Sequence, residues 1–243
     1  MKSSSETMGQ SSASDRVLVI MAKAPRPGAV KTRLAPGLSP ADVIEFYCCL
    51  LDDTLALAHS LGDVEVAIMC PESDVNELAQ LVGNDATIVP QKGEGLAAGL
   101  ISVFAHFAKD HQRRTIAFNS DSPHLPRSVL EDAFETLSAH DVVVGPTNDG
   151  GYYLVGARSS HPALFASDGM GTSSALDRLI SRASGLQLSL GFADPFWDID
   201  TADDLSRLAA ELRLAPAKAP RTARWLKERE RAAAQLRTGT GEM

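Results

Sequence analysis

Basic side chains are concentrated in one loop near the start of the chain, although the 243-residue protein has a formal net charge of −8. The loop follows the apolar run 17–22, and four cationic residues occupy it: Lys23, Arg26, Lys31 and Arg33. Lysine offers a point charge to phosphate oxygens, and arginine offers a planar fork. A glycine, Gly28, allows backbone N–H groups to come close to a ligand. The pattern predicts a phosphate-binding loop, and the alternative is a solvated loop with scattered charges.

Carboxylates in two later segments suit a divalent metal. Asp121 follows the predicted strand 115–118, where a carboxylate could hold Mg²⁺ or Mn²⁺ against phosphate oxygens. The alternative is that Asp121 caps a helix near residue 127, and the spacing alone does not choose between the two. Asp198 and Asp200 alternate in an extended segment, so both side chains face one side and could reach one metal. These three acids are therefore the candidate metal ligands.

Two glycine-containing loops are candidates for the remaining contacts. In the turn at residues 147–151, Asn148 and Asp149 could orient an acceptor, and the adjacent Gly150 and Gly151 permit a tight backbone. A hairpin turn with no further role is the alternative. In the loop 91–96, glycines could pack against a flat nucleobase just before a predicted helix. The candidate nucleotide contacts in this second loop are Gly93, Gly95 and Leu96.

Alternating strands and helices must position these loops. Ser39 and Pro40 are a helix-start signal, and apolar residues recur at helical spacing after them. The predicted strands are 17–22, 64–70, 86–89, 115–118, 142–144, 152–155 and 186–190. The predicted helices are 72–82, 96–108, 127–138, 172–184, 202–212 and 222–236, and a further helix starts at residue 40. This order predicts an α/β fold with a mostly parallel sheet, an antiparallel element after residue 145 and helices on both faces. Open parallel sheets bind ligands beyond the carboxyl ends of their strands, which is where the candidate loops lie.

Length and composition favour one globular domain. Of the residues, 44% are hydrophobic and 22% are charged, which is ordinary for such a domain. We expect a single transferase domain over residues 15–236, a disordered serine-rich tail at 1–14 and a frayed tail at 237–243. No apolar run approaches the roughly 20 residues of a membrane span, and the acidic balance does not suggest nucleic-acid binding. A cytoplasmic protein is therefore expected, with a homodimer as one option.

Four motifs in sequence order carry a family resemblance. They are K-A-P-R-P-G-A-V-K-T-R-L, N-S-D-S-P, G-P-T-N-D-G-G-Y-Y-L-V-G and D-I-D-T-A-D-D-L, and they fall between residues 17 and 205. Together they resemble the GT-A fold transferase family called radical-SAM/selenodomain-associated transferase 1, of the DUF2064 type. The first motif, with Asp53 and Thr54 after it, is also similar to 2-phospho-lactate guanylyltransferases and, more distantly, to molybdenum-cofactor guanylyltransferases.

The resemblance implies a Rossmann-like nucleotide-diphospho-sugar transferase (GT-A) fold, a nucleotide substrate and a divalent metal. It implies metal contacts at Asp121 and Asp200. It assigns phosphate contacts to Lys23, Lys31 and Arg33, and acceptor or sugar contacts to Asp149, Gly150 and Gly151. Two departures matter. The G-x-x-x-R start of nucleotidyltransferases is replaced by K-x-P-x-P-G, and residues 93–96 match the guanylyltransferase base loop only in part. The leaving-group contacts and the base therefore stay open.

Three functional hypotheses follow. The first is nucleotidyl transfer from an NTP to a small phosphorylated acceptor, in which Lys31 and Arg33 neutralise the departing pyrophosphate. The second is glycosyl transfer from a nucleotide-diphosphate sugar, in which Asp149 activates the acceptor hydroxyl. The third is a nucleotide-binding module without turnover. We rank them in this order because the basic loop suits a triphosphate.

Overall fold

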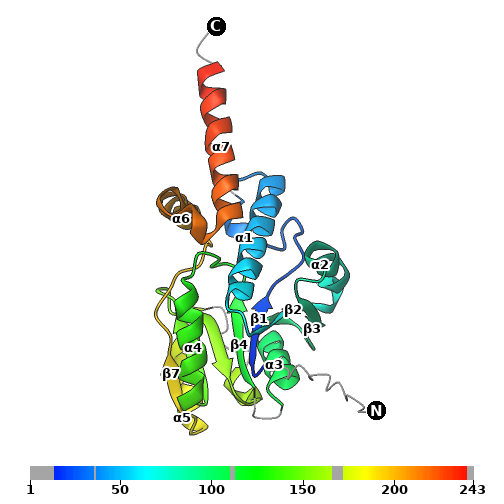
Figure 1. Cartoon of the computed structure of the whole chain (residues 1–243), viewed down its shortest axis with the longest axis vertical. Coiled ribbons are helices and arrows are strands. Elements are labelled where there is room, and N and C mark those ends of the chain that lie inside the picture. The colour runs from blue at the N-terminus through cyan, green and yellow to red at the C-terminus, as the bar shows by residue number, and fades with distance from the viewer. Residues whose placement is uncertain (1–13, 36, 110–112, 166–171, 240–243) are drawn as a thin grey trace, which may run out of the picture.

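A twisted sheet forms the centre of the computed structural model, which describes residues 14–35, 37–109, 113–165 and 172–239 (Figure 1). Its seven strands lie in the order β3-β2-β1-β4-β6-β5-β7. Their bounds are β1 Arg16–Met21, β2 Glu65–Cys70, β3 Thr87–Pro90, β4 Arg114–Asn119, β5 Val142–Pro146, β6 Tyr152–Ala157 and β7 Leu190–Phe192. The pairs β3–β2, β2–β1 and β1–β4 are parallel, and so is the pair β5–β7. Strand β6 runs antiparallel to both β4 and β5, so it is the antiparallel element that the sequence predicts.

Helices cover both faces of the sheet because the central strand is apolar on both sides. Val17 and Val19 of β1 point to one face and Leu18 and Ile20 to the other, as strand alternation requires. On the first face they pack with α3 (Gly95–Phe107) and α5 (Ala175–Gly185). On the second they pack with α1 (Pro40–Ser60), α2 (Val75–Val82) and α4 (Arg127–Ala139). The predicted α/β fold is confirmed.

The start of α1 follows its sequence signal. The Ser39 side chain accepts a hydrogen bond from the Asp42 amide, the Asp42 carboxylate accepts from the Ser39 amide, and Pro40 is the first helical residue. This capping box satisfies amide groups that the first helical turn leaves without partners. It thereby fixes where the basic loop ends and the helix begins.

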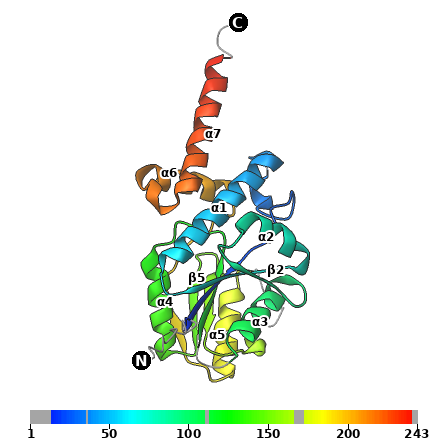
Figure 2. The same ribbon diagram turned by 45° about the vertical axis from the view of Figure 1, so that its right-hand side comes forward.

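Two C-terminal helices pack on α1 beyond the sheet. Helix α6 (Ala202–Leu214) and the base of α7 (Pro220–Gly239) share a core with α1 that contains Phe46, Trp197 and Trp225. The Asp53 carboxylate, in α1, accepts hydrogen bonds from the amides of Arg221 and Thr222 at 3.1 and 2.8 Å. The rest of α7 extends away from the domain in both ribbon views (Figures 1 and 2).

The region around β7 differs from the prediction. The helix expected at 172–184 begins at Ala175, and the strand expected at 186–190 is β7, which starts at Leu190. Helix α5 ends at Gly185, and Gln187 then adopts a left-handed backbone with φ 56°. The Leu188 amide donates back to the Ala183 carbonyl at 2.9 Å. This helix-end turn uses the residues that the apolar pattern had assigned to the strand.

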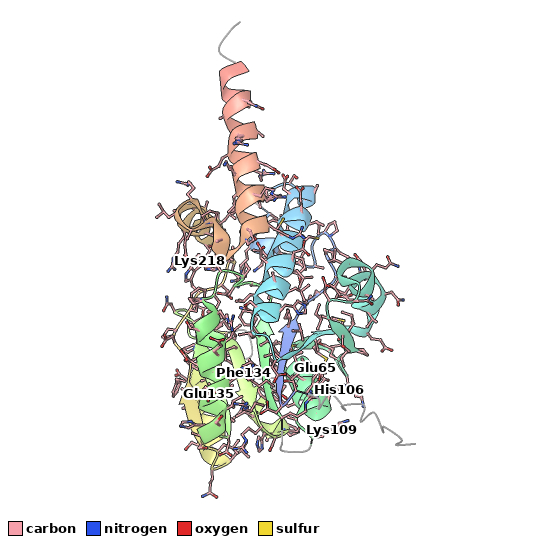
Figure 3. All side chains as sticks on the ribbon, in the orientation of Figure 1. Glu65, His106, Lys109, Phe134, Glu135 and Lys218 are labelled. Atoms are coloured by element: carbon pink, nitrogen blue, oxygen red, sulfur yellow. The ribbon has the colours of Figure 1, made fainter. Side chains whose placement is uncertain are left out.

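The remaining expectations about the chain concern its ends and its environment. Helix α7 continues to Gly239, and the expected N-terminal tail falls almost wholly outside the described residues. Within the described ranges, no helix is long and apolar enough to cross a membrane. Figure 3 shows Glu65, His106 and Lys109 at one end of the sheet and Lys218 towards the other, beside α6. The candidate loops lie near neither Glu65 nor Lys109, because they follow the opposite, carboxyl ends of the strands.

Candidate active site

A cavity of about 940 Å³ lies beyond the carboxyl ends of β1, β2, β3 and β4. It sits where the chain crosses from one side of β1 to the other, the switch point at which open α/β sheets bind ligands. The predicted site residues that line it are Lys23, Lys31, Arg33, Gly93, Gly95, Leu96, Asp121 and Asp200. The structure thus brings together the basic loop, the glycine loop and two of the three candidate metal ligands.

The basic loop is anchored to α2 by one of its own cations. Arg26 pairs with Asp74 at 2.7 Å and with Glu77 at 2.8 Å. The buried Asp74 carboxylate also accepts from the Ala24 amide at 2.9 Å. Arg26 is therefore a structural side chain, so three of the four cations of the loop face the cavity. Gly28, with φ 76°, turns the loop, but it does not line the cavity.

Lys31 lies between the two acids of the cavity. Its ammonium is 2.9 Å from an Asp121 oxygen and 3.1 Å from an Asp200 oxygen, and it also donates to the Ile199 carbonyl. Burial by itself would lower the pKa of Lys31, but the charges of Asp121 and Asp200 outweigh burial and the pKa is raised. Lys31 is therefore fully charged at neutral pH. Arg33 is more loosely placed, 3.6 Å from Asp200 with a 72% exposed side chain.

Asp198 lies outside the lining of the cavity but within reach of its charges. Burial, and then repulsion from Asp200 and Asp121, raises the pKa of Asp198 to about 6. Asp198 therefore feels the charges of the other two candidate ligands without lining the cavity. Asp121 is not a cap for α4, since that helix begins after Pro126 without a side-chain capping bond.

The acids fit a cation that is shared with a substrate. Within the described ranges, no three His, Cys, Asp or Glu side chains are close enough to hold a metal by themselves. Two carboxylates instead share one ammonium, at 2.9 and 3.1 Å. Magnesium is commonly bound by one or two carboxylates together with substrate phosphates. The oxygen donors of Asp121 and Asp200 therefore suit Mg²⁺ better in the presence of a phosphate ligand than alone.

Tyr47, which was not among the residues predicted for the site, lines the cavity from α1. Its hydroxyl accepts from the Lys23 amide and donates to the Lys23 carbonyl, both at 3.1 Å. Burial, with the charge of Asp121, raises the pKa of Tyr47 to about 12. The phenol is therefore neutral and fixes the start of the basic loop. Tyr47 follows the helical spacing of the apolar residues of α1, which is typical of a core residue, so no signal in the sequence distinguished it.

The glycine loop is braced by two polar side chains. The Gln91 amide group donates to the carbonyls of Gly93 and Gly95 at 2.9 and 3.4 Å. The Lys92 amide donates to the Ser102 hydroxyl of α3 at 2.8 Å. Both glycines have φ near 80°, a conformation that other residues rarely adopt. The loop is thus preformed at one wall of the cavity.

The turn at 147–151 is not part of the cavity lining. The Asp149 carboxylate accepts from the Thr147 hydroxyl and from the Gly151 amide, so it closes its own turn. The Thr147 hydroxyl, the Gly151 amide and the charge of Arg33 together lower the pKa of Asp149. A side chain at Gly150 would collide with the Ser173 carbonyl, only 2.0 Å from the Cβ position. The turn supports the hairpin alternative locally, and the acceptor roles of Asn148, Asp149, Gly150 and Gly151 stay predictions.

Known proteins share this fold and part of this sequence. The family model described as an uncharacterized protein conserved in bacteria (DUF2064) matches residues 54–172, just under half of the chain. The expected family resemblance is confirmed. The 2-phospho-L-lactate guanylyltransferase of Methanothermobacter thermautotrophicus is 29% identical over 182 residues, which cover 73% of this chain and 78% of that protein.

Solved structures confirm the predicted fold. A crystal structure from Desulfovibrio desulfuricans G20, assigned to the nucleotide-diphospho-sugar transferases, has a TM-score of 0.82 at 24% identity and covers 91% of this chain and 98% of that one. A nucleotidyl transferase from Methanothermobacter thermautotrophicus has a TM-score of 0.58 at 16% identity, over 82% and 99% of the two chains. At these identities the likeness is one of architecture.

Proposed function

We propose that the protein is a nucleotidyltransferase that moves a nucleoside monophosphate group from an NTP to a small phosphorylated acceptor. An acceptor phosphate oxygen forms a bond to the α-phosphorus of the NTP. The bond from the α-phosphorus to the oxygen that bridges it to the β-phosphorus breaks, and pyrophosphate leaves. The observation that carries this proposal is the convergence of Lys23, Lys31 and Arg33 with Asp121 and Asp200 in one cavity. Cations suit the triphosphate, and acids suit the metal that accompanies it.

The size and walls of the cavity support a nucleotide as the ligand. Its volume of about 940 Å³ is within the usual range of small-molecule sites. The preformed loop with Gly93, Gly95 and Leu96 offers backbone groups to a base at one wall, and the basic loop lies on another. A nucleotide could therefore place its base and its phosphates on different walls at once.

Each charged residue then has a role in transfer. Arg33, exposed and loosely held, would follow the β- and γ-phosphates as they leave, and Lys23 and Lys31 would hold phosphate oxygens. Asp121 and Asp200, with Asp198 behind them, would hold Mg²⁺ or Mn²⁺. A bound metal would neutralise charge that develops on the phosphates. Asn148, Asp149, Gly150 and Gly151 are proposed on the acceptor side, because Asp149 lies within electrostatic reach of Arg33.

The relatives support the same chemistry. A transferase was expected from the sequence, and the 29% identity to a 2-phospho-L-lactate guanylyltransferase bears out that class. Sugar transfer would use the same acids around a nucleoside diphosphate, so the cavity shape is compatible with both donors. The products of the reaction distinguish them.

The test is product analysis with purified protein. We expect pyrophosphate from at least one NTP in the presence of Mg²⁺ and a panel of small phosphorylated acids, and we expect it to disappear in Asp200→Asn. Asp203→Asn is the matched control, because Asp203 lies exposed in the first turn of α6. Nucleotide sugars with alcohol acceptors are run in parallel. Release of nucleoside diphosphate from a sugar donor, with no pyrophosphate from any NTP, would replace nucleotidyl transfer by glycosyl transfer.

A further inference from the structure

The Lys31 ammonium is far more buried than the acids that it pairs with. Its side chain is 3% exposed, whereas those of Asp121 and Asp200 are 28% and 41% exposed. Arg33 adds only a distant second contact to Asp200. One buried cation is thus shared by two carboxylates that still face the cavity.

The fold directs this ammonium to the acids. Lys31 has φ 47°, in the left-handed region that residues with side chains rarely adopt. Its carbonyl accepts from the Leu34 amide at 3.0 Å, and Leu34 is buried in the same core as Trp197. The strained backbone is therefore held by packing, and the placement of Lys31 does not depend on its ion pairs alone.

We infer that Lys31 is a resident counter-ion of the Asp121–Asp200 pair and competes with a divalent cation for these two carboxylates. The inference rests on the proposed function, which places the cation at the same acids. Neighbouring carboxylates without a cation repel each other, and the charge of Lys31 offsets that repulsion in the nucleotide-free protein. When a divalent cation binds the two carboxylates, Lys31 can turn to triphosphate oxygens in the cavity. Metal and triphosphate binding are then coupled through one side chain.

A purely structural role for Lys31 predicts the opposite result. Lys31 donates to the Ile199 carbonyl, and the Ile199 amide donates to the Asp121 carbonyl at 3.1 Å, so the side chain also fastens three segments together. If that were its whole role, loss of the ammonium would disorder the acids and weaken metal binding. Competition predicts that the same loss strengthens metal binding.

The experiment measures Mn²⁺ binding by calorimetry, without nucleotide, in wild type, Lys31→Met and Lys23→Met. Lys23 lines the same cavity, is exposed and forms no ion pair within the described part of the chain, so Lys23→Met removes one charge without touching the acids. We expect Lys31→Met to bind Mn²⁺ at least about tenfold more tightly than Lys23→Met. Adding Asp121→Asn to Lys31→Met should abolish the gain. Equal or weaker binding by Lys31→Met overturns the inference.

A second measurement uses wild type alone and decides the question if Lys31→Met does not fold. Lysines are acetylated with acetic anhydride and quantified by mass spectrometry, with and without Mg²⁺. We expect Lys31 to be protected relative to Lys23 and its labelling rate to rise several-fold with Mg²⁺, whereas unchanged protection contradicts competition. Pyrophosphate release by wild type tests the proposed function separately. A protein that releases pyrophosphate but shows neither effect at Lys31 keeps the function and loses this inference.

Discussion

At the scale of single residues, the cavity depends on a hydroxyl that does no chemistry. Tyr47 reaches from α1 to the backbone of Lys23, the second residue after β1. A net contribution of about 1 kcal/mol to stability is usual for a hydrogen bond of this type. Its more specific effect is to hold the basic loop in the position where Lys23 and Lys31 line the cavity. Under the proposed function, Tyr47 is thus a positioning residue for phosphate binding.

Removing only this hydroxyl should separate positioning from packing. We expect Tyr47→Phe to lose about 1 kcal/mol of unfolding free energy and to bind NTP several-fold more weakly, because the loop loses its anchor. Tyr153→Phe is the control. Its hydroxyl donates to the Asp194 carbonyl at 2.8 Å, and the residue does not line the cavity. Urea unfolding and calorimetric titration should show a similar stability loss in both variants but weaker NTP binding only in Tyr47→Phe. Equal affinities would remove Tyr47 from the site.

At the scale of elements, a buried carboxylate adds a polar connection to the apolar packing of each of two helices, α2 and α7. Asp74 connects the basic loop to α2 through the Ala24 amide and Arg26. Asp53 connects α1 to α7 by accepting from the first amides of α7. A buried donor that loses its partner costs about 1–3 kcal/mol. These two acids therefore stabilise contacts between elements, and neither lines the cavity.

The pH dependence of stability should report the Asp74 contact. Burial would raise the pKa of Asp74, but hydrogen bonds from Ala24, Ser73 and Arg26 outweigh burial and lower it. A lowered carboxyl pKa stabilises the fold above the unfolded value of about 3.9, and the stabilisation is lost as pH falls through the folded pKa. We expect Asp74→Asn to be less stable than wild type in urea at pH 7, with the gap closing below about pH 4. A constant gap across this range would contradict the assignment.

The α7 contact can be tested with neighbouring acids. We expect Asp53→Ala to lower the free energy of unfolding by about 1–3 kcal/mol, since the amides of Arg221 and Thr222 lose their acceptor. Asp52→Ala is the control, because among the described residues the ion pair of Asp52 is a 3.4 Å contact with the 65% exposed Arg221 side chain. Such surface pairs contribute up to about 1 kcal/mol. Thermal and urea unfolding of both variants would show whether Asp53 is the helix cap that the structure indicates.

At the scale of the whole molecule, the sequence predicted the arrangement of loops better than the partners of individual side chains. The run 17–22 is apolar at every position because β1 is buried on both faces, and this pattern can be recognised without a structure. From the strand–helix order it follows that the loops after β1, β3 and β4 meet at one edge. The convergence of Lys31 and Asp121 was predictable for this reason.

The pairing of charges was not predictable, because it depends on segments far apart in the chain. Arg26 belongs to the basic loop by sequence, yet it pairs with Asp74 and Glu77, about fifty residues away. Lys31 contacts Asp200 across 169 residues. Asp149 was predicted to contact the acceptor substrate because of its residue type and its place in the turn. In the structure its carboxylate closes a local turn. Residue types and spacing indicate what chemistry is available, and only the packing of the elements decides which charge meets which.

A crystal structure with a non-hydrolysable NTP analogue and Mn²⁺ tests the central claim most directly. Anomalous scattering locates the metal independently of the nucleotide. The account predicts a manganese peak at Asp121 and Asp200, the triphosphate against Lys23, Lys31 and Arg33, and the base beside Gly93 and Gly95. A nucleotide bound elsewhere, for example in the cavity of about 700 Å³ between α6 and α7, or a metal peak remote from Asp121, would contradict it.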